Sequence, residues 1–282
     1  MDTRPTTADG KRAAGDATPC GAPLFRIRDA HVMRSGKETL RVDDFTLAEG
    51  EHLALLGPNG AGKSTFIQLL TRETLPLYRE QTPVLFRGQA RPTLADIRAC
   101  FGVVSATMHD QIRVHLPAVD IVCGGLFGTL GLPRHVEVTP EARRRALDAL
   151  EHVGIGDLAD RDVLTLSTGQ ARRVLVAREL VGDPQALIFD EPCTGLDPEG
   201  MYYVRDVMRT LAAEGRSVIV VTHYPEDIIP AIDRVLLIKD AAIHADGPKR
   251  DILTSERLTE LFGVPLEVSE RNGWYSLQGI YE

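Results

Sequence analysis

A glycine-rich loop between a predicted strand and a predicted helix narrows the possible folds of this chain of 282 residues. Residues 52–56 form an apolar run that we expect to be a buried strand, and residues 63–71 have the pattern of a helix. The loop between them fits the pattern G-x-x-x-x-G-K-[ST] in full. Its residues are Gly57, Pro58, Asn59, Gly60, Ala61, Gly62, Lys63 and Ser64, followed by Thr65. Strand, loop and helix in this order predict an α/β fold in which the loop binds phosphate.

Each residue type in this loop has a chemical reason for its position. Glycine lets backbone N–H groups approach phosphate oxygens, and the first helical turn directs the positive end of its dipole at the same oxygens. The Lys63 ammonium group reaches the β- and γ-phosphates, and the Ser64 hydroxyl is a ligand for Mg²⁺. A chance glycine-rich turn would not come with both flanking elements. Residues 57–65 are therefore predicted to bind a nucleotide, although the loop alone does not name the reaction.

Two carboxylates follow a second apolar run. Residues 186–189 are continuously apolar, as in a strand buried on both faces, and Asp190 and Glu191 come directly after them. Because strand ends of an open parallel sheet face the ligand crevice, Asp190 is predicted to help hold Mg²⁺. Glu191 is predicted to polarise an attacking water as a general base. A solvated acidic turn is the alternative, but it would not explain the apolar strand that leads into it.

The rest of the pattern predicts a doubly wound parallel sheet covered on both faces, with an antiparallel layer on its N-terminal side. Short strands are expected around Phe25 and Ile27 and across residues 40–47. Further strands are expected at 217–221, 235–238 and 242–244, and helices at 140–153, 169–181 and 254–262, the last closed by Gly263. Residues 266–269 and 274–277 flank Asn272-Gly273, the signal of a type I′ hairpin.

Composition disfavours a nucleic-acid partner and a metal site built from cysteines. The net charge is −8, from 32 Lys and Arg against 40 Asp and Glu, which disfavours a nucleic-acid partner. The four cysteines have no metal-ligand spacing and are predicted to be reduced thiols. They are Cys20, Cys100, Cys123 and Cys193.

No segment is predicted to cross a membrane by itself. The nearest approach, residues 116–132, contains Asp120 and four glycines, and we expect a buried or groove-lining helix there. Residues 1–23 have no apolar centre and are predicted to be a disordered leader rather than a signal peptide. We therefore expect a cytoplasmic protein unless another chain holds it at a membrane.

A short motif between the phosphate loop and the acidic strand selects a family. Leu166-Ser167-Thr168-Gly169-Gln170 opens a predicted helix, where Ser167 is a natural cap and the free N–H groups form a second anion site. Thr194-Gly195-Leu196-Asp197 and Val221-Thr222-His223 follow at strand ends. With these motifs the chain resembles the ATP-binding cassette (ABC) family, whose signature is LSGGQ, with Thr168 in place of the first glycine. The resemblance covers about residues 24–263, leaving 264–282 as a C-terminal hairpin extension.

The resemblance implies a P-loop NTPase fold: a RecA-like parallel sheet core with an antiparallel β subdomain and a helical subdomain. It implies that the chain binds ATP and Mg²⁺ and hydrolyses ATP. Two cassettes, here a homodimer, would sandwich the nucleotides head to tail. The phosphate loop of one chain would then face Ser167, Gly169 and Gln170 of the other, with Asp197 nearby. His223 would contact the γ-phosphate and help Glu191 orient water.

The resemblance also implies partners at the cytoplasmic face of a membrane. The cassette would energise a permease on another chain, with an extracytoplasmic substrate-binding protein as a possible third component. The loop after residues 101–104 and the segment 253–265 resemble the corresponding parts of cassettes for molybdate and iron-siderophore uptake. This resemblance favours import. In that branch residues 116–132 would contact the permease, although a helix that serves only the fold explains them equally well. The sequence does not name the transported substrate.

Two positions depart from the family pattern. Arg34 stands where the family places an aromatic residue that stacks on adenine, a role that a planar guanidinium can also fill. A plain exposed arginine without that role explains this position equally well. Ala106 stands where a glutamine usually touches Mg²⁺, and His109 and Gln111 come too late to inherit that role. The metal contact from this loop therefore has no predicted donor.

Two alternative functions fit the sequence less well. A soluble ABC protein acting on ribosomes or DNA would be expected to have two cassettes or a long coiled coil, and neither pattern is present. A phosphate-loop kinase outside the family would leave residues 166–170 and His223 without a role.

Overall fold

The computed structural model describes residues 22–133 and 136–281. In this part of the chain, nine strands form one sheet in the order β4-β1-β2-β9-β8-β3-β7-β6-β5. Five of them run parallel and make the core: β8 (Arg234–Lys239), β3 (Leu53–Leu56), β7 (Ser217–Thr222), β6 (Ala186–Asp190) and β5 (Phe101–Ser105). All four residues of β3 and all six of β7 are buried, as expected for parallel strands covered on both faces. The predicted parallel core is confirmed.

The antiparallel layer is more regular than the sequence suggested. It contains β1 (Pro23–Arg34), β2 (Lys37–Ala48) and β4 (Val84–Phe86), and only the pair Arg41 and Ala242 joins it to β9 (Ala242–Pro248). The prediction of short strands here was wrong, because β1 and β2 each have 12 residues. Their turn has positive φ at Ser35 and Gly36, the geometry of a two-residue hairpin turn that matches strand twist and sustains long strands.

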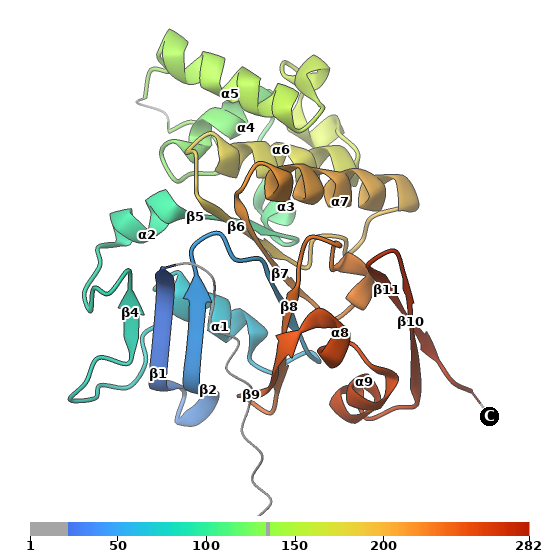
Figure 1. Ribbon diagram of the computed structural model, residues 1–282. Helices are drawn as coiled ribbons and strands as arrows, with labels where there is room; N and C mark the ends of the chain where they lie inside the picture. Colours follow the sequence, from blue (N-terminus) through green and yellow to red (C-terminus); the bar gives the residue numbers. More distant parts are fainter. Residues whose placement is uncertain (1–21, 134–135, 282) are drawn as a thin grey trace, which may run out of the picture.

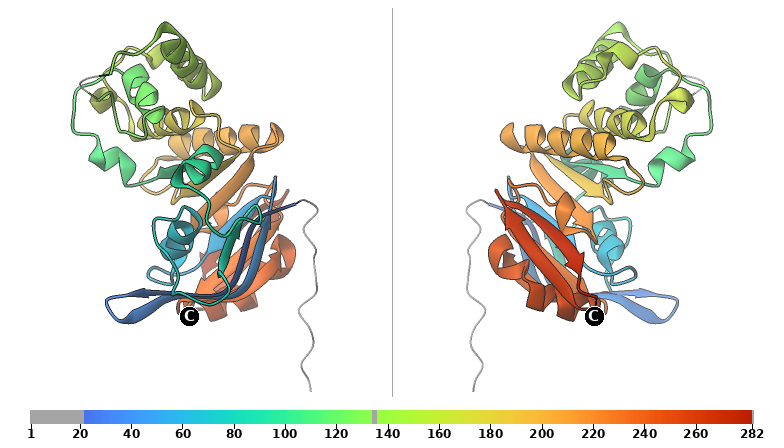
Figure 2. Two further views of the ribbon diagram at one scale, coloured as in Figure 1. Left: turned by 90° about the vertical axis from the view of Figure 1, so that its left-hand side faces the viewer. Right: turned by 90° about the vertical axis from the view of Figure 1, so that its right-hand side faces the viewer.

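Helices cover the two faces of the core sheet, as Figures 1 and 2 show. On one face α1 (Lys63–Leu70) lies between the sheet and the antiparallel layer, and the rings of Phe45 and Phe66 meet edge to face at 5.0 Å. The other face packs on α6 (Thr168–Leu180) and α7 (Pro198–Ala213). Alternate strand residues supply the two cores, so Leu55 faces α1 and Leu56 faces α6.

A helical region packs against α6. Its helices are α3 (Met108–Gln111), α4 (Ala118–Gly125) and α5 (Pro140–His152), with 3₁₀ turns η1 (Gly156–Leu158) and η2 (Val163–Thr165); α2 (Leu94–Cys100) precedes β5. In Figure 1, α4 and α5 lie beyond α6, and α3 is in contact with both α6 and β5. The helix expected over residues 116–132 is correct only for its first half. Beyond Gly125 the chain turns, with Gly128 and Gly131 at positive φ. These glycines favour a left-handed backbone that ends helical continuation.

The C-terminal part follows the predicted pattern closely. After η3 (Pro225–Asp227) come β8, β9, α8 (Lys249–Ile252) and α9 (Ser255–Phe262), which Gly263 closes at φ 74°. A separate hairpin of β10 (Leu266–Arg271) and β11 (Trp274–Gly279) completes the chain. Asn272 and Gly273 both have positive φ, which confirms the predicted type I′ turn.

Some predictions concern segments that the structure does not describe. Of the predicted leader, residues 1–21 and therefore Cys20 lie outside the described residues, and β1 already begins at Pro23. Cys100, Cys123 and Cys193 are buried free thiols. Across residues 22–133 and 136–281, every helix is too short or too polar to span a bilayer.

Candidate nucleotide-binding and hydrolysis site

The phosphate loop is held between β3 and α1 by close backbone contacts. A Cβ atom at Gly57 would lie 2.2 Å from the carbonyl oxygen of Ile238, so only glycine fits there. Gly62 has φ 112°, a left-handed conformation, immediately before the first residue of α1. The loop therefore presents backbone N–H groups and the positive end of the α1 dipole at the same place.

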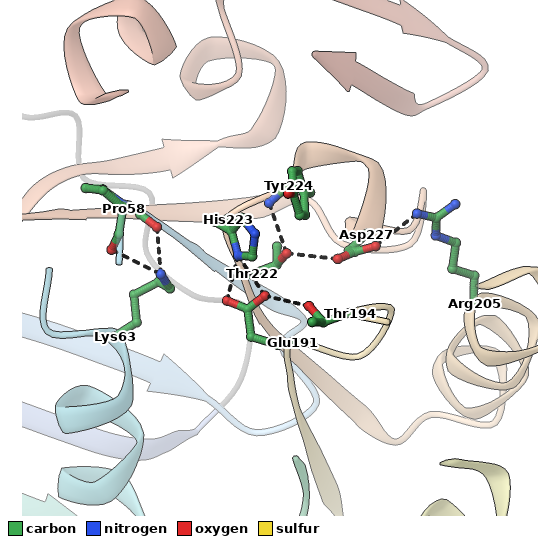
Figure 3. Close-up of polar contacts among 10 residues, drawn as sticks. Pro58, Lys63, Glu191, Thr194, Arg205, Thr222, His223, Tyr224 and Asp227 are labelled. Carbon is green, nitrogen blue, oxygen red and sulfur yellow. Dashed lines mark hydrogen bonds and ion pairs between the residues drawn. The ribbon is translucent and has the colours of Figure 1, made fainter. Parts of the chain in front are cut away.

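Lys63 lies across this loop. Its ammonium group donates hydrogen bonds to the carbonyl oxygens of Gly57, at 2.6 Å, and Pro58, at 3.2 Å (Figure 3). Burial lowers the pKa of Lys63, and the negative charges of Glu191 and Asp190 oppose that shift. A buried cation next to a phosphate loop is arranged to bind an anion. Ser64, the next residue, is exposed on the first turn of α1.

Asp190 and Glu191 lie at the end of β6, as the sequence predicted. Burial, and then the charge of Glu191, raise the pKa of Asp190, while Lys63 lowers it. Glu191 has φ 53°, which is uncommon for a residue with a side chain, and its N–H donates to Val221 of the neighbouring strand at 2.8 Å. Such a conformation costs about 1 kcal/mol or more and is often found at functional sites.

The left-handed turn brings Glu191 to His223. The Nδ1 atom of His223 lies 2.8 Å from one carboxylate oxygen of Glu191 and 2.7 Å from the other (Figure 3). The Thr194 hydroxyl donates to the same carboxylate at 3.2 Å. Glu191, Thr194 and His223 come from two separate loops that follow β6 and β7. The structure therefore joins the two residues that the sequence predicted as catalytic.

A buried network supports His223 from behind, and the sequence analysis did not single it out. The Thr222 hydroxyl donates to Asp227 at 2.9 Å, and Arg205 of α7 donates to the other oxygen of Asp227, also at 2.9 Å (Figure 3). Asp227 is 2% exposed. A buried carboxylate paired in this way fixes the segment 222–227. The only sequence signal was an acidic residue shortly after a histidine at a strand end.

The signature motif forms a capped helix start. The Ser167 hydroxyl accepts from Gln170 N–H at 3.2 Å, and the Gln170 side chain accepts from Ser167 N–H at 3.0 Å, which completes a capping box. A Cβ at Gly169 would lie 2.9 Å from Cα of Gly200, so α6 and α7 approach closely there. Asp197 caps α7 by accepting from Gly200 N–H at 2.7 Å.

These two groups of residues are not joined within one chain. Among the hydrogen bonds and ion pairs of residues 22–133 and 136–281, none connects residues 167–170 with the phosphate loop. Ser167 and Asp197 are exposed.

The two positions that depart from the family pattern lie near the site. Arg34, at the end of β1, is exposed and donates to the side chain of Gln68 on α1 at 2.5 Å, so its guanidinium lies on the helix of the phosphate loop. Ala106 N–H donates to the Asp190 carbonyl oxygen at 3.1 Å. Residue 106 therefore has the expected place, but a methyl group cannot ligate a metal. Gln111 is exposed on α3, and the side chain of His109 lies outside the described part of the chain.

The donor atoms suit Mg²⁺. The Asp190 carboxylate and the Ser64 hydroxyl are hard oxygen ligands of the kind that Mg²⁺ prefers. Within the described residues, no cluster of three or more His, Cys, Asp or Glu could hold a metal by itself. A magnesium ion here would take its remaining ligands from substrate phosphates and water, as is usual for this ion.

Comparison with known proteins decides the family. The model of the family described as ABC transporter matches residues 40–194, from β2 through the phosphate loop and signature to Thr194. The chain belongs to the ABC transporter family. The cassette is 32% identical over 248 residues to an uncharacterised ABC transporter ATP-binding protein, YlmA, of Bacillus subtilis, covering 87% of this chain and 93% of that one.

Other relatives of the cassette include importers and exporters. The molybdenum import ATP-binding protein ModC of Mycobacterium tuberculosis is 37% identical over 227 residues, which cover 76% of this chain and 58% of ModC. The Nod factor export ATP-binding protein I of a Rhizobium species is 34% identical over 243 residues, covering 83% and 75%. The chain is thus an ABC transporter ATP-binding subunit, and these relatives do not share one direction of transport.

Solved structures confirm the fold. CbiO1 of Clostridium perfringens, part of the ABC transporter complex cbiONQ, superposes with a TM-score of 0.70 and 27% identity over 85% of this chain and 94% of its own. A cassette solved as a dimer after hydrolysis, with ADP and Pi bound, gives 0.65 and 23% over 80% and 98%. As a member of the ABC transporter family, the cassette is an ATPase. ABC cassettes as a family dimerise and pair with membrane permeases.

Proposed function

We propose that this chain hydrolyses MgATP as a homodimer at the cytoplasmic face of a membrane and thereby energises a permease on another chain. The observation that carries the proposal is the contact between Glu191 and His223 at the carboxyl ends of β6 and β7, on the same side as Lys63. In this arrangement a general base, a cation for the phosphates and a histidine face one crevice.

The residues divide the work as follows. The N–H groups of residues 57–65 and the Lys63 ammonium group bind the β- and γ-phosphates. Ser64 and Asp190 would hold Mg²⁺, which neutralises charge on the phosphates. Glu191 accepts a proton from the attacking water, and Thr194 keeps its carboxylate in place. His223 holds both the carboxylate and the γ-phosphate.

The second half of each site comes from a second copy of the chain. Ser167, Gly169 and Gln170 form an anion-binding helix start that is not joined to the phosphate loop of its own chain. Ser167 and Asp197 are exposed, as a surface that meets a partner must be. Head-to-tail pairing would place this helix start against the γ-phosphate of the other chain, and Arg34 would lie beside the adenine.

A mixing experiment tests this composite site. Lys63→Ala removes the phosphate ligand and Ser167→Arg blocks the signature, so each variant alone is expected to lack ATPase activity. Mixed dimers contain one site with an intact loop from the Ser167→Arg chain and an intact signature from the Lys63→Ala chain. We expect partial recovery of phosphate release on mixing. No recovery at any ratio, with mixed dimers present by native mass spectrometry, would contradict the head-to-tail arrangement.

The surface for the permease lies at the ends of α4 rather than along it. Most of α4 is buried in the core, which supports the explanation that the helix itself serves the fold. Val114 and Phe127, which flank α4, are exposed by 49% and 43%. A permease helix placed against them would bury their apolar surface. We assign them to the permease contact.

Membrane association tests this coupling. In cells that encode the chain, the fraction of the cassette that floats with membranes is measured. Phe127→Asp is expected to release the cassette into the soluble fraction. Leu164→Asp, at a site exposed by 41% on η2, is the matched control and is expected to stay bound. Equal flotation of both variants would contradict the role of Phe127 in the contact. Wild-type cassette that stays in the soluble fraction would favour the rival function, a soluble ABC ATPase without a permease.

Import is the direction that we propose, because the loop after β5 and the C-terminal pattern resemble uptake cassettes and ModC is an importer. An extracytoplasmic substrate-binding protein would then be a third component. Uptake measured with and without the cassette, in the cells that encode it, distinguishes import from export.

A further inference from the structure

The C-terminal hairpin packs on the segment that follows His223. Its strand β11 contacts η3, which begins two residues after His223 (Figure 1). Leu277 N–H donates to the Glu226 carboxylate at 2.7 Å. At the turn of the hairpin, a Cβ on Gly273 would lie 3.1 Å from Cβ of Pro230, so the two loops are in close contact.

Lys249 fastens the same two segments together. Its ammonium group donates to the carbonyl oxygens of Ile229, Pro230 and Gly273, at 3.4, 3.1 and 3.3 Å. Lys249 is 7% exposed, and its charge is therefore satisfied mainly by these carbonyl groups. The hairpin is thus fixed to residues 226–230 at both its turn and its strand.

The N–H group of Leu277, which donates to Glu226, takes no part in the hydrogen bonds between β10 and β11. Val268 and Leu277 face each other across the two strands. Val268 N–H donates outward to the Ser255 hydroxyl at 2.9 Å and Leu277 N–H donates outward to Glu226, so this pair is one that does not bond within the ladder. Removal of the Leu277 N–H therefore leaves the hydrogen bonds between the strands intact.

The contact between Glu226 and β11 comes at a cost to the stability of the fold. Its second carboxylate oxygen is buried and has no hydrogen-bond partner in the part of the chain that the structure describes. A buried unpaired carboxylate oxygen destabilises a fold, and such groups are commonly found where position matters more than stability. Glu226 lies three residues after His223.

His223 is thereby held between two anchors. On one side the pair of Thr222 and Asp227 is tied to Arg205 of α7, and on the other side Glu226 is tied to β11. We propose that the C-terminal hairpin is a positioning element for His223 and that Glu226 is the residue through which it acts. The proposal rests on the function proposed above for His223.

The physical reason is the sensitivity of catalysis to geometry. His223 has to keep both its contact with Glu191 and its reach to the γ-phosphate. A displacement of about 1 Å at a reacting group can cost as much as about 100-fold in rate. Loss of the β11 anchor would therefore change turnover, while the phosphate loop, on the other side of the crevice, would keep its affinity for ATP.

The test compares Glu226→Ala with Glu226→Gln in the full chain. Glu226→Ala removes the acceptor and is expected to lower kcat about tenfold with KM for MgATP unchanged. Glu226→Gln keeps an acceptor oxygen and is expected to retain most of kcat. Gln278→Ala, at an exposed position of β11, is the control for changes to the hairpin surface. An unchanged kcat in Glu226→Ala would overturn the proposal.

A double-mutant cycle separates positioning from general damage. Single-turnover ATP cleavage, with enzyme in excess, is measured for His223→Ala with and without Glu226→Ala. If Glu226 acts through His223, the second substitution has no further effect. A tenfold loss in both backgrounds would overturn the proposal. Wild-type chain that cleaves no ATP would instead contradict the proposed function.

A second pair of variants removes the same hydrogen bond from the other side. Leu277→Pro lacks the N–H group and lies on the outer edge of a hairpin, where proline is tolerated. Leu277→Ala keeps the N–H group and controls for the lost side chain. We expect the kcat of Leu277→Pro to fall below that of Leu277→Ala by about the factor seen in Glu226→Ala. Equal kcat in the Leu277 pair would contradict the role of the hairpin even if Glu226→Ala did not fold.

Discussion

Lys63 is a cation whose immediate neighbours are carbonyl oxygens of its own loop. It donates to Gly57 and Pro58, and the charges of Asp190 and Glu191 stabilise its protonated form against burial. An arriving phosphate would replace these neutral carbonyl acceptors with anionic oxygens, so that both partners of each hydrogen bond carry charge. The affinity for nucleotide therefore depends strongly on this one side chain.

Replacement of Lys63 by alanine is expected to weaken ATP binding itself. The lost charge-assisted contacts amount to about 1.5–3 kcal/mol, which corresponds to about a 10- to 150-fold rise in Kd. Isothermal titration calorimetry with MgATP measures the change. Lys37→Ala, at the exposed first residue of β2, is the control and is expected to leave Kd unchanged. Equal Kd values for the two variants would show that Lys63 does not contact the nucleotide.

Much of the site could be predicted at this scale because its residues stand in local motifs. Lys63, Asp190 and Glu191 lie at the ends of strands and at a helix start, as their spacing predicted. The left-handed backbone of Glu191 and the network of Thr222, Asp227 and Arg205 could not be predicted, because both depend on contacts between residues far apart in the sequence. The role of Arg34 stays a prediction.

At the scale of elements, the contact between α6 and α7 depends on two glycines. A methyl group at Gly169 would lie 2.9 Å from Cα of Gly200, and backbone atoms cannot move aside as a flexible side chain can. The Ser167 cap predicts α6 from the sequence. No helix was predicted at α7, although Asp197 is its N-cap and Pro198 is its first residue. The motif around Asp197 was interpreted only as part of the nucleotide site, whereas Asp197 also caps α7.

Gly169→Ala is expected to destabilise the cassette by about 1–3 kcal/mol, because overpacking forces the two helices apart. Chemical denaturation measures the free energy of unfolding. Gly182→Ala is the matched control, since its Cβ would lie at an ordinary 3.6 Å from the Glu179 carbonyl oxygen. A Gly169→Ala variant as stable as the Gly182→Ala variant would mean that the helices are less closely packed than described.

A second element-scale prediction concerns pH and the contact between β3 and β7. His52, just before β3, accepts a hydrogen bond from Val218 N–H at its Nδ1 atom, at 3.1 Å, which requires the neutral ring. Burial lowers the pKa of His52 below its ordinary value of 6.5. Because the folded state resists protonation, this contribution to stability is present above pH 6.5 and is lost as pH falls through the lower pKa of the folded state.

We therefore expect the free energy of unfolding to fall as pH is lowered from 6.5, and to fall less steeply in His52→Asn. Asparagine has an acceptor oxygen near the place of Nδ1 but does not titrate in this range. Denaturation curves at several pH values below 6.5 give the two slopes. Identical slopes in the two proteins would show that His52 makes no contribution to acid sensitivity.

At the scale of the whole molecule, the sequence predicted the order and packing of the layers. Continuous apolar strands alternating with helices predicted a sheet covered on both faces, and the two buried cores on opposite faces of β3 confirm it. The lengths of β1 and β2 were underestimated, because their twelve-residue pairing depends on the partner strand rather than on local pattern. The helix over residues 116–132 was overestimated for a different reason, because Gly128 and Gly131 take a left-handed backbone after α4 ends.

The proposed division of the nucleotide site between two chains has a consequence for assembly. In the described part of one chain, no hydrogen bond or ion pair joins the signature at residues 167–170 to the phosphate loop, whereas Glu191 and His223 are already in contact. ATP that cannot be cleaved should therefore hold two chains together. Glu191→Gln keeps the shape of the side chain but removes the general base, which contributes about 100- to 10,000-fold to the rate.

The most direct measurement is light scattering of Glu191→Gln on a sizing column, with and without MgATP, combined with analysis of the bound nucleotide. We expect a dimer that forms only with MgATP and retains uncleaved ATP, and a monomer when Ser167→Arg is added. Cleavage of ATP at the wild-type rate, or tight ATP binding without any dimer, would contradict it.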